Sequence, residues 1–74
     1  MSYPDPHNIA EVLLRHAEAS EKLHLTNASI YLDNPAGIGE HNDILEACQA
    51  ELDKAAMHRD RKELLLTMLH GSHD

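Results

Sequence analysis

A single helix-breaking segment divides this chain into two long stretches with helical periodicity. The segment from Asp33 to Asn42 reads D-N-P-A-G-I-G-E-H-N, with one Pro and two Gly, residue types that favour turns and interrupt helices. Before and after it, apolar residues recur mostly three and four positions apart, which is the helical period. Two helices joined by a short connector fold back antiparallel. The pattern therefore predicts an all-α fold, an antiparallel two-helix hairpin that forms a single domain over residues 1–74.

The ends of both helices can be placed from local signals. Pro6 suits the first position of a helix over about residues 6–32, because a free N–H is not needed there. Pro35 disfavours a helical conformation in the residue before it, so the helix should stop before that point. Gly71 is expected to end a second helix over about residues 43–70, as the residue just past its last turn.

The apolar residues are spread more widely around each helix than one partner helix can cover. The chain contains eleven Leu and nine Ala, but one Val and no Phe or Trp, a composition that disfavours strands. One stripe on the first helix holds Ile9, Leu13, Leu23 and Ile30, and off it lie Val12, Leu14, Leu25 and Leu32. We therefore expect self-association, with a dimer that forms a four-helix bundle favoured and a larger helical oligomer as the alternative.

Charge and cysteine content restrict the function classes. Six Lys and Arg against thirteen Asp and Glu give a net charge of −7, which disfavours nucleic acids and anionic membrane surfaces as partners. No apolar run approaches the roughly 18 residues of a membrane span, and the first residues lack the features of a signal peptide. Cys48 is the single cysteine, so a reducing compartment, the cytoplasm, is expected. Its apolar register predicts a buried structural thiol rather than a nucleophile, and we expect neither enzymatic activity nor a cofactor.

The connector and the start of the second helix carry a resemblance to a known group of proteins. The string N-P-A-G-I-G-E-H-N-D, from Asn34 to Asp43, resembles a segment of short uncharacterised helical proteins of tailed bacteriophages, including phages of marine cyanobacteria. The resemblance covers about half the chain, from Asn34 through the second helix. It implies a viral origin and a role in the cytoplasm of an infected bacterium, and no activity comes with it.

Histidine and glutamate spacings offer a metal-binding alternative. Glu21 and His24 form a Glu-x-x-His element, which ferritin-like bundles use to bind metal; otherwise both are solvated surface residues. Folding the chain about its connector places His16 opposite His58, a pair that could bind zinc, make assembly sensitive to pH, or simply lie half-exposed along the seam.

The favoured function is a small acidic interaction or regulatory protein that self-associates and binds a host or viral protein; that it is phage-encoded is what the resemblance implies. The expected anchors are the consecutive Leu64, Leu65 and Leu66, with Arg59 in the one locally basic run. That run, residues 59–63, should make the contact between the helices polar, which can fix the register of the helices or mark a docking position. Ile38 either packs beneath the hairpin or is presented to the partner. The alternative function is a ferritin-like or zinc-binding helical bundle.

Overall fold

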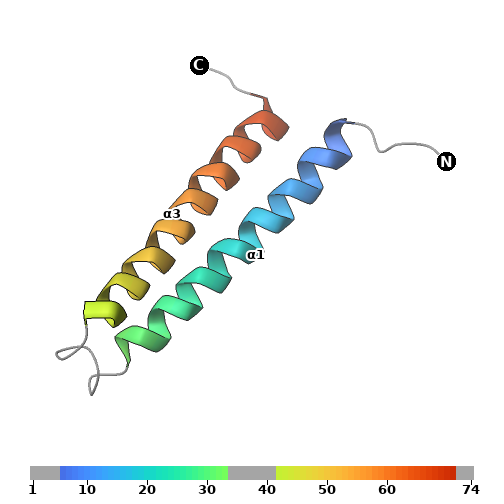
Figure 1. Ribbon diagram of the computed structural model, residues 1–74. Coiled ribbons are helices and arrows are strands. Elements are labelled where there is room, and N and C mark those ends of the chain that lie inside the picture. Colours follow the sequence, from blue (N-terminus) through green and yellow to red (C-terminus); the bar gives the residue numbers. More distant parts are fainter. Residues whose placement is uncertain (1–5, 34–41, 72–74) are drawn as a thin grey trace.

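The fold is the predicted all-α hairpin (Figure 1). The computed structural model describes residues 6–33 and 42–71, which form helix α1 (Pro6–Leu32) and helix α3 (Asn42–His70). The two helices run antiparallel side by side, so the start of α1 and the end of α3 lie at the same end of the molecule. Each is about 40 Å long at the usual rise per residue. Their bounds agree with those expected from sequence to within one residue.

Local chemistry accounts for where each helix stops. The backbone N–H of Asp33 donates a hydrogen bond of 2.9 Å to the carbonyl of Ser29, which completes the last turn of α1 immediately before Asn34 and Pro35. Beyond α3, Gly71 has a φ of 73°, a left-handed conformation that glycine adopts without steric cost and that closes many helices.

The residues that α1 packs against α3 are mostly small or polar. The buried positions of α1 are Leu14, Ala17, Glu21 and Ala28. They are separated by three, four and seven residues, which is the heptad spacing of a coiled-coil seam. Half-buried Ala10, His24 and Tyr31 continue the same spacing.

The seam of α3 has the same character. Its buried positions are Cys48, Ala55, His58 and Leu65, again at heptad spacing. Half-buried Ile44, Glu51, Lys62 and Leu69 complete the series. Alanine at the contact lets two helices approach closely, but it buries little apolar area.

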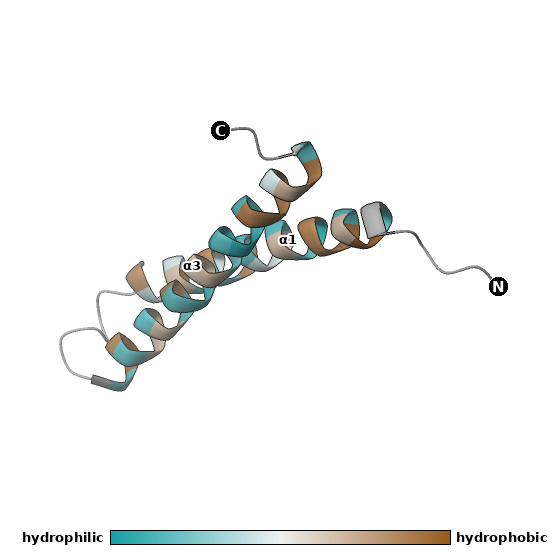
Figure 2. Ribbon diagram, turned by 90° about the horizontal axis from the view of Figure 1, so that it is seen from above, coloured by the Kyte–Doolittle hydropathy of each residue, from teal (hydrophilic) through white to brown (hydrophobic). Residues whose placement is uncertain are grey.

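Most of the large aliphatic side chains consequently lie outside the seam. Of the eleven leucines, Leu14 and Leu65 are buried. Figure 2 shows apolar stretches around both ribbons, and not only where the helices meet. Polar residues interrupt these stretches, and neither helix, over the residues described, is apolar enough to cross a membrane. The hairpin thus packs through a narrow, partly polar seam and presents much of its aliphatic surface to solvent.

Candidate functional site

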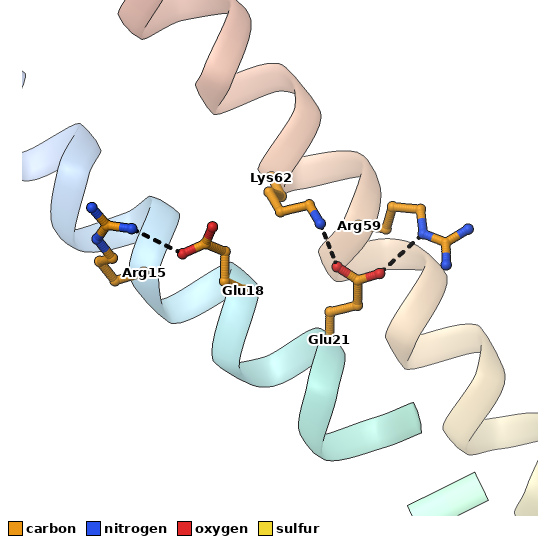
Figure 3. A network of polar contacts seen from close by, with 5 residues as sticks. All are labelled: Arg15, Glu18, Glu21, Arg59 and Lys62. Carbon is orange, nitrogen blue, oxygen red and sulfur yellow. Dashed lines mark hydrogen bonds and ion pairs between the residues drawn. The ribbon is translucent and has the colours of Figure 1, made fainter. Parts of the chain in front are cut away.

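A buried carboxylate links the two helices near the middle of the seam (Figure 3). Glu21 of α1 is only 8% exposed. Its Oε1 accepts a hydrogen bond of 2.8 Å from Lys62 Nζ, and its Oε2 accepts one of 3.0 Å from Arg59 Nε. The bond from Lys62, followed by the bond from Arg59, lowers the pKa of Glu21, and burial opposes them less strongly. The carboxylate is therefore ionised at neutral pH and joins α1 to two cations of α3.

A second polar cluster joins the helices on the loop side of Glu21. Glu51 Oε1 lies 2.7 Å from His24 Nδ1 and accepts a hydrogen bond of 2.8 Å from Asn27 Nδ2. The hydrogen bond with His24, and next the one from Asn27, lowers the pKa of Glu51. An ionised carboxylate can only accept hydrogen bonds, so Nδ1 of His24 must carry the proton of this contact. The bond fixes both the tautomer and the orientation of the His24 ring.

His58 lies between the polar clusters and is more enclosed than His16, His24 and His70. It is 8% exposed, and its Nδ1 is buried with no hydrogen-bond partner. The ring stacks on His24 with centroids 5.5 Å apart and planes 4° from parallel. His16 meets it edge-on at 6.0 Å. Burial lowers the pKa of His58 most, and the positive charge of Arg61 lowers it further.

The predicted pairing of His16 with His58 is confirmed by this geometry, and the stack on His24 was not foreseen. The interpretation of Glu21 and His24 as solvated surface residues is wrong, because both lie in the seam. The two side chains have different partners, since Glu21 binds two cations and His24 binds Glu51. Within residues 6–33 and 42–71, no three His, Cys, Asp or Glu side chains come together as a metal site.

The expected interaction residues have different environments. Leu65 is 7% exposed and packs in the seam. The expectation that it is an exposed anchor for a partner is therefore wrong. Leu64 is 66% exposed and Leu66 is half-buried. The Nε of Arg59 donates a hydrogen bond to Glu21, so the seam is polar at this point, as predicted. Ile38 lies outside the described residues.

Cys48 is buried, as predicted for a structural thiol. Its Sγ lies 3.8 Å from the carbonyl oxygen of Ala28, so the thiol faces the backbone of α1 and not a base that could activate it. This environment gives the thiol a packing role between the helices.

Twelve large apolar side chains are exposed in the part of the chain that the structure describes, and five of them lie elsewhere on the helices: Val12, Leu25, Leu32, Leu45 and Leu52. The other seven form a set on one side of the hairpin, with polar residues between some of its members. Each of its members lies one position before a seam residue, and in an antiparallel pair such positions fall on the same side of both helices. The polar contacts agree, because Asn27 and His16 also precede seam residues and reach Glu51 and His58 on that side. We call the set the apolar face; it consists of Ile9, Leu13, Leu23, Ile30, Met57, Leu64 and Met68.

The polar seam residues Glu51 and Lys62 were missed from the sequence. A heptad count carried through polar positions would have found them, because they continue the spacing of Cys48, Ala55 and His58.

Comparisons with protein-family models, curated proteins and solved structures gave no match to this chain. Its function is therefore inferred from the hairpin itself.

Proposed function

We propose that this chain is a small interaction protein that self-associates through the apolar face and binds a protein partner. The observation that supports this is the distribution of side chains: the seam is built largely of alanine, histidine and glutamate beside Leu14 and Leu65, whereas the leucine, isoleucine and methionine side chains of the apolar face are exposed. Exposed apolar side chains that gather on one side of a protein are typical of interaction sites.

The size of the face is consistent with an association of modest strength. Its seven side chains are between 46% and 71% exposed, and complete burial of such a side chain contributes about 1.5–3 kcal/mol. About 1 kcal/mol each remains to be gained, or about 14 kcal/mol for two chains that cover each other's faces. The loss of free motion on association costs about 4–15 kcal/mol. A pair that uses the whole face can form, whereas one that uses the α1 part alone would be marginal.

Charge favours a protein partner over a nucleic acid. The net charge of −7 repels phosphate backbones and steers the chain toward basic surfaces. A host or viral protein with an apolar groove and a basic rim is the partner that this combination fits, and the bacteriophage resemblance would place the encounter in an infected bacterium.

Sedimentation velocity and light scattering test self-association directly. The double variant L23E/I30E places charge on the apolar face, and A19E adds one charge at an exposed position of α1 outside the face. We expect the mass of the wild-type chain and of A19E to rise above 8.3 kDa with concentration. L23E/I30E should stay at 8.3 kDa with unchanged helicity. A wild-type mass of 8.3 kDa up to about millimolar concentration, where a weak complex still forms, would contradict the proposal.

Partner binding is tested with the same variants. Affinity capture from bacterial extract should retain a protein on the wild-type chain and on A19E, and lose it on L23E/I30E. Identical capture by all three would show that the apolar face does not bind it.

A further inference from the structure

One buried titratable group has no role in the proposed self-association. His58 sits in the seam at neutral pH with its Nδ1 buried and unpaired. A neutral imidazole tolerates this, because one of its nitrogens carries no proton. Protonation would turn Nδ1 into a donor that faces no acceptor, and it would place a positive charge in a poorly hydrated position.

The groups around His58 make that charge more costly. From α1, the rings of His24 and His16 face it, and the Nδ1–H of His24 donates its hydrogen bond to Glu51. The carboxylates of the two polar clusters are already engaged, since Glu21 binds Lys62 and Arg59 and Glu51 binds His24 and Asn27. Within α3, the positive charge of Arg61 disfavours a second cation at His58.

We propose that the His58–His24 stack is an acid-sensitive latch, which holds α1 and α3 together at neutral pH and loosens when His58 is protonated. The unfolded chain takes up a proton at histidine near the ordinary pKa of 6.5, and the folded chain resists protonation of His58 until the pH is lower. Protons therefore favour the open chain in this interval. The stabilisation of the hairpin by neutral His58 is fully present above about pH 6.5, and it is lost as the pH falls through the lowered pKa of His58. The latch lies within one chain and does not depend on self-association.

Thermal unfolding followed by circular dichroism, in steps from pH 7.5 to 5.0, tests the latch. This range stays above the titration of Glu21 and Glu51, whose pKa values are lowered. H58L and H58Q remove the buried imidazole, and H70Q removes an exposed one from the same helix. We expect the melting temperature of the wild-type chain and of H70Q to fall by about 5 °C or more across the range. The melting temperatures of H58L and H58Q should change much less.

The outcomes separate the latch from the proposed function. The same melts are run in the L23E/I30E background, so that an effect on the hairpin is not confused with an effect on association. A fall in H58L and H58Q equal to that of the wild type, or no fall in the wild type, would overturn the latch. Either result leaves the concentration dependence of the mass untouched, and that dependence is what tests self-association.

Discussion

Neighbouring leucines of α3 should respond very differently to truncation. Leu65 is 7% exposed and packs in the seam, whereas Leu64 is 66% exposed on the apolar face. Both substitutions to alanine remove the same atoms, and leucine and alanine are both good helix formers. The pair of variants L65A and L64A therefore isolates the contribution of burial in the seam from the intrinsic preference for helix.

The expected difference follows from the area that each side chain buries. Removing most of a buried leucine side chain costs about 2–3 kcal/mol, and the lower part of the usual range applies because a two-helix seam can close around the space. Folded chains of this size are stable by about 4–11 kcal/mol. L65A should thus lower the melting temperature by about 10–20 °C, at about 4–8 °C per kcal/mol. L64A, which loses about a third of that burial, should lower it by about 3–7 °C.

The assay is thermal unfolding by circular dichroism at a concentration where light scattering shows a single chain. Equal losses for L64A and L65A under these conditions would refute the seam register, because they would require Leu64 to be as buried as Leu65 within one hairpin. At high concentration, where the chains associate, L64A should reduce the mass of the complex more than L65A does, because Leu64 lies on the apolar face.

Three further predictions concern the seam. E21Q should lower the melting temperature at pH 7 by several degrees, and by more than E18Q does, because Glu21 binds two cations of α3. Since the pKa of Glu21 is lowered, the stabilisation by its carboxylate is present above about pH 4.5. The difference in melting temperature between E21Q and the wild-type chain should therefore disappear in melts below that pH. A17L should destabilise the hairpin by about 1–3 kcal/mol in urea unfolding through overpacking at a fully buried position, and A19L, at an exposed one, by less than about 0.5 kcal/mol. The thiol of Cys48 should react with a thiol reagent about a hundredfold more slowly in the folded chain than in denaturant, because its exposure requires local opening that costs about 3 kcal/mol; equal rates would show that Cys48 is accessible.

The architecture was predictable because its signals are local. Pro6, Pro35 and Gly71 act on the backbone within one or two residues of themselves, so the helix bounds could be read without knowledge of the packing. The pairing of His16 with His58 followed from the antiparallel fold alone. Leu65 was placed outside the seam in error, because three consecutive leucines offer no local signal for which of them faces the partner helix.

The polar half of the seam could not be found by apolar periodicity. Glu21, Glu51 and Lys62 occupy positions where that periodicity expects apolar residues, and they can do so because each finds a partner on the other helix. Such pairing is a property of two helices at once. It becomes visible only when the register between them is known.

The polar seam and the apolar face have separate tasks in this arrangement. A slip of α3 by one heptad would bring Leu52 and Ala55, or Leu66 and Leu69, to the level of Arg59 and Lys62. The carboxylate of Glu21 would then be buried against apolar side chains, which is a severe penalty for an ion without its partners. The seam therefore selects one register at little gain in apolar burial, and this choice leaves the large aliphatic residues free for a second surface. A chain with leucines in place of the polar seam residues would form a more stable hairpin, but it would have less apolar surface with which to bind another molecule.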